Sequence, residues 1–321
     1  MPWARRIATT VLRSSTVNGA ARAIASARGH RLVLLYHRLG VPVPAGCEVV
    51  PSVPLSLFKA QLQALGAVVD FVALDEIIAE TPGRSGGHQH RPRVAVTFDD
   101  DLPSHVEHAL PVLQERGVPA TFFLSGRALH GLGAYWFQHL EALLIAYGER
   151  RTAAKLSTPE SSAAALVLAC ERSADLRRRV SELAEDLPAP GILQRDGIAA
   201  LGAAGMTIGF HTVWHDRLPD LDDLALEPAV SRGRADLAAA AGAPVHYFAY
   251  PHGKSDARSA VAVGRAGFKA AFTGAPRPVR YGDDPYRLGR WEPGRLEADE
   301  LVAKLTVRLH RAAPSSSSQA S

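Results

Sequence analysis

The sequence predicts an α/β fold in which a mainly parallel sheet closes into an irregular barrel of about seven strands. Two observations predict it. Helical segments alternate with short apolar strands, and a Gly follows the last turn of most of these helices, as a left-handed cap requires. In addition, polar residues stand where the strands end, which is where parallel sheets place their binding and catalytic groups.

The elements of this repeating unit can be placed from the hydrophobic pattern and from the positions of Gly. The expected strands cover residues 31–36, 94–98, 120–124, 206–210, 245–250 and 268–272. The expected helices cover about 104–116, 192–203 and 223–240, and a fourth begins at Ser255 or Asp256 and ends before Gly267.

Residues 131–190 interrupt this rhythm with helical sequence rich in Ala, Leu, Glu and Arg, including a predicted helix start at Thr158-Pro159. We expect a helical insertion over the barrel mouth, within one domain that spans residues 31–296. Residues 1–30 are expected to form a basic helical leader. Residues 297–321 are expected to form a C-terminal helix and a disordered tail, because the Ser-rich end has nothing to bury.

The net charge of +4 is concentrated at the N-terminus. Residues 1–31 hold six arginines and no acid, so the remainder is near −2, which is no nucleic-acid footprint. The leader is weakly amphipathic, and it is interpreted either as a peripheral contact with an anionic membrane surface or as a solvated helix. No apolar run reaches the roughly 18 residues of a spanning helix, and none resembles a secretion signal, so a cytoplasmic protein is expected. Cys47 and Cys170 lack metal-ligand spacing and are expected to stay reduced.

Two groups of residues indicate a metal site. His211 and His215 follow an apolar strand at a spacing of four, which would project both imidazoles from one face of a helical turn. Asp99 and Asp100 end another strand, and both reach one site if that strand is already turning. Two imidazoles and one carboxylate leave a position open for water, as in catalytic zinc sites. The alternatives are a chance histidine pair and a solvated acidic turn.

Three motifs, TFDD at 97–100, HTVWH at 211–215 and FAYPHG at 248–253, resemble the successive motifs of polysaccharide deacetylases with a NodB-homology domain, carbohydrate esterase family 4. The resemblance covers about 31–295 and implies an irregular (β/α)7 barrel. It also implies removal of the N-acetyl group from a sugar of a cell-surface polysaccharide, a glycolipid or a precursor. The implied partner is an N-acetylated glycan or a lipid-linked or nucleotide-linked sugar.

The resemblance also assigns roles to residues. Asp99 is the implied general base, and the implied ligands of a divalent metal, Zn²⁺ or else Co²⁺, Mn²⁺ or Ni²⁺, are Asp100, His211 and His215. The family's Leu-x-His motif is matched by Leu35-Tyr36-His37, an arrangement similar to that of circularly permuted poly-N-acetylglucosamine deacetylases. It implies His37 as the general acid, and a purely structural histidine is the alternative.

The third motif and the aromatic residues supply the expected substrate contacts. The backbone N–H of His252 is expected to face the oxyanion. The side chains expected to contact the substrate are those of Tyr250, Pro251, Trp214 and Arg290. Trp136 and Trp291 are further candidates for stacking on sugar, although core packing is the commoner role of a single aromatic residue.

The sequence departs from the family pattern in three places. Asp101 replaces the Gly of the usual FDDG, which leaves the local turn open. Ala249 replaces the arginine that orients the base, and Arg287 or Arg290 is the expected substitute. No clear Asp-x-x-Asp-Trp motif is present.

Three alternatives to a sugar deacetylase remain at this stage. A phosphatase of the haloacid-dehalogenase type would use Asp99 as the nucleophile together with Mg²⁺, but it would leave His211 and His215 idle. The other two are a catalytically silent glycan-binding module and a related amidase that acts on a non-sugar substrate.

Overall fold

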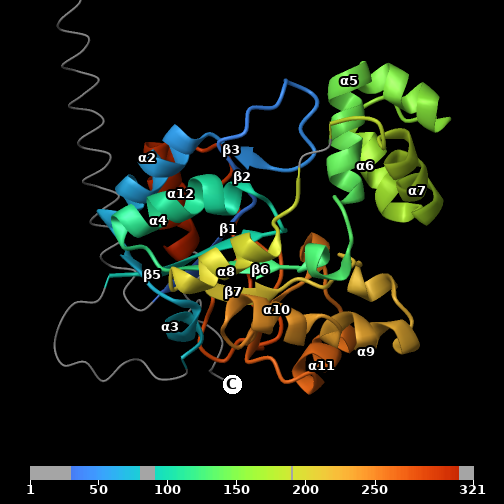
Figure 1. The fold of residues 1–321 in the computed structure, drawn as a ribbon. Coiled ribbons are helices and arrows are strands. Elements are labelled where there is room, and N and C mark those ends of the chain that lie inside the picture. The colour runs from blue at the N-terminus through green and yellow to red at the C-terminus, as the bar shows by residue number, and fades with distance from the viewer. Residues whose placement is uncertain (1–29, 80–90, 189–190, 311–321) are drawn as a thin grey trace, which may run out of the picture.

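The computed structural model describes residues 30–79, 91–188 and 191–310 (Figure 1). The predicted leader, apart from its last residue, and the predicted disordered tail lie outside these residues. Among the described residues, no helix combines the length and the apolar character that a bilayer-spanning helix needs.

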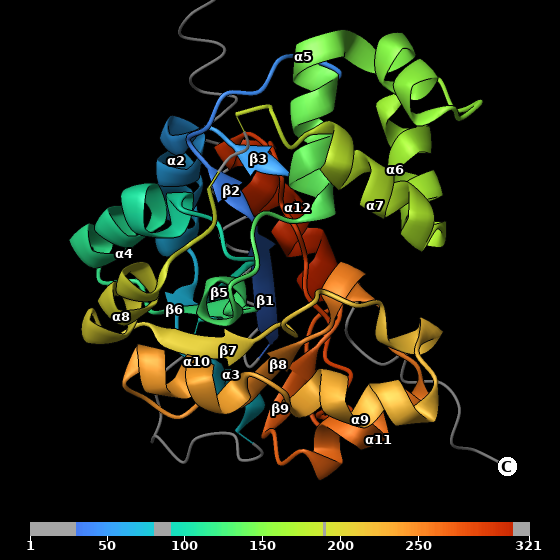
Figure 2. The ribbon, with the colours of Figure 1, turned by 45° about the vertical axis from the view of Figure 1, so that its right-hand side comes forward.

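A curled parallel sheet forms the centre of the molecule (Figure 2). All of its strand pairs are parallel, which confirms the predicted α/β class, and the six predicted strands are present within a few residues of their expected limits. In spatial order the strands are β1 (Arg31–Tyr36), β5 (Arg93–Asp99), β6 (Ala120–Leu124), β7 (Thr207–Phe210), β8 (Tyr247–Ala249) and β9 (Ala270–Phe272), and the short β4 (Asp70–Phe71) also pairs with β5.

An irregular segment, residues 288–291, lies between the two outer strands β9 and β1. Leu288 exchanges backbone hydrogen bonds of 2.8 and 3.0 Å with β9, and Trp291 exchanges bonds of 2.8 and 3.0 Å with β1. Each contact is a single bridge rather than a ladder. The barrel is therefore closed by hydrogen bonds at this segment without a regular strand, and we call residues 288–291 the closing segment.

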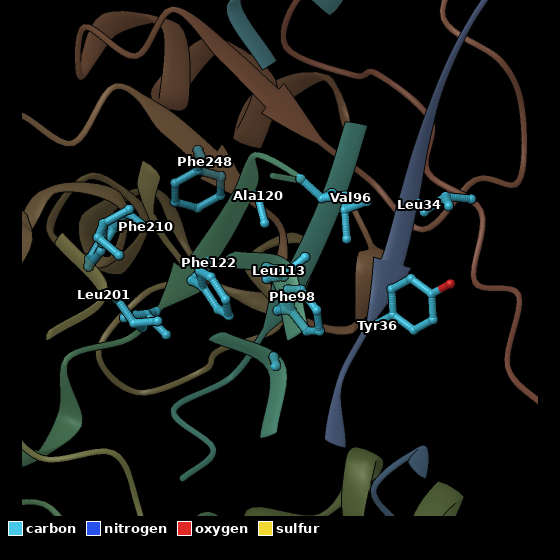
Figure 3. Packing of buried hydrophobic residues seen from close by; sticks show 14 of the residues in the cluster. Leu34, Tyr36, Val96, Phe98, Leu113, Ala120, Phe122, Leu201, Phe210 and Phe248 are labelled. Atoms are coloured by element: carbon cyan, nitrogen blue, oxygen red, sulfur yellow. The ribbon is translucent and has the colours of Figure 1, made fainter. Parts of the chain in front are cut away.

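Alternation along the strands divides the side chains between two faces. One face packs against the surrounding helices in the main core, as Figure 3 shows for residues such as Tyr36, Phe98 and Phe122. The opposite face fills the barrel interior with residues that include Val33, Ala95, Phe123 and Ala249. Because the alternation has a period of two, residues 37, 99 and 211 fall on the interior face at the carboxyl ends of their strands.

Three of the four predicted barrel helices are present as single helical segments, and the helices Leu55–Gly66 and Leu74–Ile78 were not predicted. The predicted helix over 223–240 is two helices, because Gly233 has a φ of 86° and Arg232 before it is extended. The surrounding helices are α2 (Leu55–Gly66), α3 (Leu74–Ile78), α4 (Leu110–Arg116) with a π-helical turn (His105–Ala109) before it, α8 (Arg195–Ala203), α9 (Asp223–Ser231), α10 (Arg234–Ala241), α11 (Ala257–Arg265) and α12 (Ala298–His310).

Between β6 and α8 the chain forms three α-helices that stand together to one side of the barrel helices (Figure 1). These are α5 (Trp136–Leu156), α6 (Ala163–Arg172) and α7 (Ala174–Leu183), and they share an apolar core of their own. The predicted helix start at Thr158-Pro159 is wrong. Helix α6 begins four residues later, because the side chain of Ser162 accepts a hydrogen bond from the N–H of Ala165 and caps the helix there.

A buried ion pair attaches these helices to the barrel. Arg38 belongs to β2 (Arg38–Leu39), which pairs with β3 (Ser52–Val53) in a small second sheet that the sequence did not predict. The guanidinium of Arg38 donates to both carboxylate oxygens of Glu141 on α5. The same carboxylate accepts the backbone N–H groups of Val49 and Val50. The first part of α5 is therefore held beside the loop between β2 and β3.

Candidate active site

Three predicted ligand side chains converge at the carboxyl edge of the sheet. The Nε2 atoms of His215 and His211 lie 3.2 and 3.7 Å from the same carboxylate oxygen, Oδ1 of Asp100. Ligand atoms about 2 Å from one tetrahedral ion lie roughly 3.3 Å apart, so these separations match a shared divalent ion. All three side chains are almost fully buried.

Left-handed backbone positions produce this convergence. Asp100 has a φ of 73°, which turns the chain directly after β5 and brings its side chain to the same site as Asp99. Thr212 and His215 have φ values of 53° and 57°. The two histidines therefore converge through an irregular turn, and the predicted helical turn is wrong. A non-glycine residue at positive φ costs about 1–3 kcal/mol and is typical of functional sites.

The hydrogen bonds of these three residues fit a metal ion. Oδ1 of Asp100 is buried and accepts no well-aligned hydrogen bond from the described residues. Nδ1 of His211 lies 2.8 Å from the carbonyl oxygen of Ala249, so this nitrogen carries the proton and Nε2 presents its lone pair to the site. Burial lowers the pKa of His211 to about 4, which keeps the imidazole neutral and able to ligate. The three residues thus have the donor set and spacing that fit a divalent metal ion.

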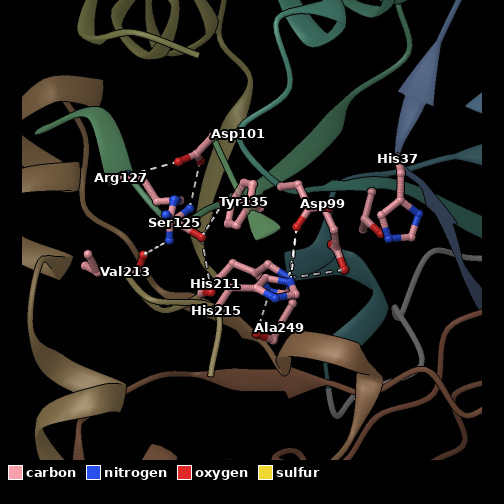
Figure 4. Close-up of polar contacts among 12 residues, drawn as sticks. His37, Asp99, Asp101, Ser125, Arg127, Tyr135, His211, Val213, His215 and Ala249 are labelled. Carbon is pink, nitrogen blue, oxygen red and sulfur yellow. Dashed lines mark hydrogen bonds and ion pairs between the residues drawn. The ribbon is translucent and has the colours of Figure 1, made fainter. Parts of the chain in front are cut away.

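Asp99 lies beside this site and is held by a buried arginine. Arg290, from the closing segment, donates to Oδ1 and Oδ2 of Asp99 at 2.6 and 2.7 Å. Burial alone would raise the pKa of Asp99, but the paired charge and the hydrogen bonds of Arg290 outweigh it and hold the pKa below its usual value. Asp99 Oδ2 is 3.9 Å from Nε2 of His211 (Figure 4). A charged carboxylate therefore sits next to the metal ligands.

Asp101, which stands where the family pattern has Gly, has a structural role. Its fully buried carboxylate accepts the backbone N–H groups of Ser125 and Arg127 at 2.9 Å, and that of Gly126 at 3.3 Å (Figure 4). Burial nevertheless raises its pKa to about 6. The side chain of Asp101 fixes the turn after β6 at the edge of the site. The positive φ of Asp100 turns the chain so that Asp101 faces this turn.

His37 stands at the end of β1 and faces the same cavity. Its Nδ1 lies 3.1 Å from Oε1 of Glu292, the residue directly after the closing segment. Burial would lower the pKa of His37, but the hydrogen bond and charge of Glu292, together with the charges of Asp100 and Asp99, raise it to about 9. The imidazole is therefore protonated at neutral pH. The sequence reasoning missed Glu292, although its spacing of two from Arg290 puts both on one face of an extended chain.

The substitution Glu292→Gln is expected to lower the pKa of His37 well below about 9 in the metal-free protein, because it removes the paired charge. A raised folded-state pKa stabilises the protein below the unfolded value of about 6.5, and this contribution is lost as the pH rises through about 9. NMR titration of His37 measures the first effect, and thermal unfolding at several pH values measures the second. Glu297→Gln is the control, and an unchanged His37 titration would refute the pairing.

The active-site cavity has a volume of about 360 Å³. Seven predicted site residues line it: His37, Asp99, Asp100, His211, His215, His252 and Arg290. The helices between β6 and β7 add Trp136 and Phe137 from α5 and Glu171 from α6. The ring of Phe137 lies 5.3 Å from that of His215, in an edge contact. These helices thus supply one wall of the site.

His252 lies in the turn after β8 with a φ of 57°. Its ring is 4.7 Å from that of His215, and its Nδ1 is 3.5 Å from the carboxylate of Glu171. Burial lowers the pKa of His252 to about 3, and the nearby His215 lowers it further in the same direction. The side chain is therefore a neutral group in the cavity wall, in addition to any role of its backbone N–H.

The predicted substrate contacts need correction. Tyr250 is fully buried, and its hydroxyl donates to the carbonyl of Tyr286, because Tyr250 shares the outward face of β8 with Phe248. Pro251 is buried and does not line the cavity. Arg290 is buried and donates to Asp99, to the carbonyl of Thr273 and to the hydroxyl of Thr97, so its contacts orient the base.

The aromatic candidates differ in their surroundings. Trp214 is 42% exposed and lines a second cavity of about 280 Å³, which shares Trp136, Glu171, His215 and His252 with the first. Trp136 thus faces both cavities. Trp291 is buried in the core. Arg287 is exposed, so Arg290 is the arginine that replaces the missing one of the third motif.

A curled parallel sheet with three side chains that could hold a divalent ion, beside an arginine-held carboxylate, is an arrangement that fits a metal-dependent enzyme of the α/β class. Residues 86–271 match the model of the family described as polysaccharide deacetylase. The chain therefore belongs to the polysaccharide deacetylase family.

Solved structures share the fold at low sequence identity. A deacetylase from Streptococcus pyogenes, PplD, solved with acetate, is 16% identical with a TM-score of 0.59, and the match covers 88% of this chain and 99% of that one. IcaB from Ammonifex degensii is 23% identical with a TM-score of 0.56, and the match covers 87% and 97%. A de-N-acetylase from Aggregatibacter actinomycetemcomitans is 15% identical with a TM-score of 0.54, over 82% and 94%. No curated protein sequence matches the chain significantly.

Proposed function

We propose that the protein hydrolyses the N-acetyl group of a sugar in a cell-surface glycan or its precursor, releasing acetate and leaving a free amine. The observation that carries this proposal is the placement of the Arg290-held Asp99 carboxylate beside the Asp100, His211 and His215 ligands. The family supplies the deacetylase chemistry. PplD, solved with acetate, and IcaB have the same fold.

In this mechanism Asp99 takes a proton from the attacking water. Asp100, His211 and His215 would hold the metal ion, and zinc fits this donor set of two imidazoles and one carboxylate. When bound, the ion acts as a Lewis acid on the acetyl carbonyl and acidifies water. Asp99 stays ionised because Arg290 lowers its pKa, so it is ready to accept a proton at neutral pH.

Collapse of the tetrahedral intermediate breaks the C–N bond, and the nitrogen must be protonated as it leaves. His37 supplies this proton, because the paired Glu292 keeps its imidazole charged at neutral pH. The oxygen of water ends in acetate; one of its two protons goes to Asp99, and the other is lost to solvent when the acetic acid ionises. The N–H of His252 stabilises the charge that develops on the carbonyl oxygen. A charged imidazolium favours an amide substrate, since the nitrogen leaves readily only when it is protonated, and an unprotonated amide anion is a poorer leaving group than an alkoxide.

The second cavity supports a glycan as the substrate. Trp136 and Trp214 line it, and it opens from the active-site cavity at His215 and His252. Aromatic faces commonly stack on sugar rings, and the half-exposed Trp214 offers such a face. We propose that a sugar next to the reacting one occupies this cavity.

Acetate release from a panel of N-acetylated sugars tests the proposed function. Metal-reconstituted wild type is expected to release acetate, and His211→Ala is expected to lose the metal together with at least about 10³-fold of the activity, because the ligand set falls to two. His246→Ala, outside the site, is the control and is expected to retain both. Silence of the wild type across the panel, with metal bound, would reject the sugar deacetylase and favour an amidase for a non-sugar substrate.

A further inference from the structure

A third hollow, with a volume of about 310 Å³, adjoins the active site on the side of the turn after β8. Three stretches of chain form it: the turn after β8, the stretch after β9 and residues 284–287. None of the residues in its wall has a role in the proposed hydrolysis. We call it the basic pocket and define it by Lys254, Ser255, Thr273, Arg277, Asp284 and Arg287.

The basic pocket has an excess of positive charge. Lys254, Arg277 and Arg287 line it, against the single carboxylate of Asp284. Arg277 is held in place, since it donates to the carbonyl of Arg287 at 2.7 Å and pairs with Asp283 at 3.3 Å. Even with Asp283 counted, one positive charge remains in excess.

Two of these cations are available to a ligand. Lys254 and Arg287 are exposed, and neither forms an ion pair within 4.0 Å in the described part of the chain. The hydroxyl of Ser255 lines the same hollow. An ammonium, a guanidinium and a hydroxyl are the donors that protein sites use for phosphate and carboxylate groups.

The ridge between the basic pocket and the active-site cavity carries no side chains. Gly253 lines both hollows, and Gly274 lines the active-site cavity next to it. The N–H of Gly274 donates to the carbonyl of Gly253 at 3.0 Å, and Gly253 has a φ of 65°. A Cβ on Gly253 would lie 2.7 Å from the backbone of Gly274. Gly253 and Gly274 are thus in contact and place no side chain between the two hollows, so that one ligand can extend across them. We call these two glycines the saddle.

We propose that the basic pocket binds an anionic group, phosphate or carboxylate, carried by the reacting sugar or its neighbour. This inference rests on the proposed deacetylation, and it narrows the substrate class to acidic N-acetylated glycans or sugar phosphates. The acetamide enters the metal-site cavity while the anionic group crosses the saddle to Lys254 and Arg287. The cations increase affinity for the anionic substrate and take no part in bond cleavage.

The kinetic test compares three substrates: a neutral N-acetylglucosamine oligomer, N-acetylglucosamine 1-phosphate, and an oligomer in which N-acetylglucosamine adjoins a uronic acid. Lys254→Gln and Arg287→Gln are each expected to lower kcat/KM for an anionic substrate about tenfold, through KM, because each removes one charge-assisted hydrogen bond. The neutral oligomer is expected to react unchanged. A loss with N-acetylglucosamine 1-phosphate identifies the anionic group as phosphate, and a loss with the uronic acid oligomer identifies it as carboxylate.

The matched control is Arg265→Gln, which removes an exposed arginine of α11 outside the pocket, and it is expected to change no substrate's kinetics. Equal losses on neutral and anionic substrates, or no loss on any of them, would overturn the proposal. In either case acetate release by the wild type would leave the proposed deacetylation standing.

A binding measurement keeps the pocket testable if the wild type releases no acetate from any substrate, which would reject the deacetylation itself. Calorimetry with inorganic phosphate is expected to show binding to the wild type. The double variant Lys254→Gln, Arg287→Gln is expected to weaken this binding at least about tenfold, and Asp100→Asn is expected to leave it intact. Phosphate binding that is lost only in Asp100→Asn would assign the phosphate to the metal site and refute the basic pocket. The absence of any phosphate binding would also refute the basic pocket.

Discussion

Asp99→Asn is expected to lower kcat for acetate release by about 10²–10⁴-fold, the usual contribution of a general base, while the protein keeps its divalent ion. The amide cannot accept the proton that the carboxylate removes from water. It preserves the shape of the side chain and can still accept a hydrogen bond from Arg290. Metal content and kcat measured on the same preparation separate loss of the base from loss of the ion.

The control for this substitution is Asp299→Asn, which changes an exposed carboxylate of α12 outside the cavities. It is expected to leave both kcat and metal content unchanged. If Asp99→Asn retained most of the activity with metal bound, another group would have to accept the proton, and the role proposed for Asp99 would be abandoned.

Arg290→Met is expected to destabilise the protein by about 3 kcal/mol, because it leaves the carboxylate of Asp99 buried without its partner. It also raises the pKa of Asp99. In the wild type the lowered pKa gives stability that is present above the unfolded value of about 3.9 and is lost as the pH falls through the folded-state pKa. The acidic limb of the pH profile of kcat/KM is therefore expected to move to higher pH in the variant.

Urea unfolding of the metal-free protein measures the stability change, and kinetics with the neutral oligomer give the pH profile. Arg290→Lys keeps the charge but loses the two-pronged contact, so an intermediate loss is expected. Arg287→Met, at the exposed arginine that sequence could not distinguish from Arg290, is expected to leave both readouts unchanged. An acidic limb that stays in place in Arg290→Met would show that Arg290 does not tune Asp99.

The strands and the metal ligands could be predicted from sequence because they depend on local signals. Apolar runs with Gly before them define the strands, and the polar residues directly after them mark the active edge of the sheet. Asp100, His211 and His215 carry such signals. The helical geometry assigned to the two histidines was wrong, because a spacing of four also fits a turn with two left-handed residues, and a sequence does not reveal φ.

Other features depend on contacts between distant parts of the chain. The choice between Arg287 and Arg290 depended on the closing segment, whose single bridges leave no strand pattern to read. Tyr250 could have been placed in the core from alternation, because it is two residues from Phe248 on one strand face. The proposed basic pocket combines three stretches that are far apart in sequence, and nothing in each stretch alone indicates an anion.

The closing segment also has a consequence for when the protein becomes active. A ribosome delivers the chain from its amino end, so the three metal ligands emerge before residues 288–292. A nascent chain at that stage has all its metal ligands, but Asp99 lacks its arginine, His37 lacks its glutamate, and the edges of β9 and β1 are unpaired. In the proposed mechanism, hydrolysis therefore begins only after the barrel has closed.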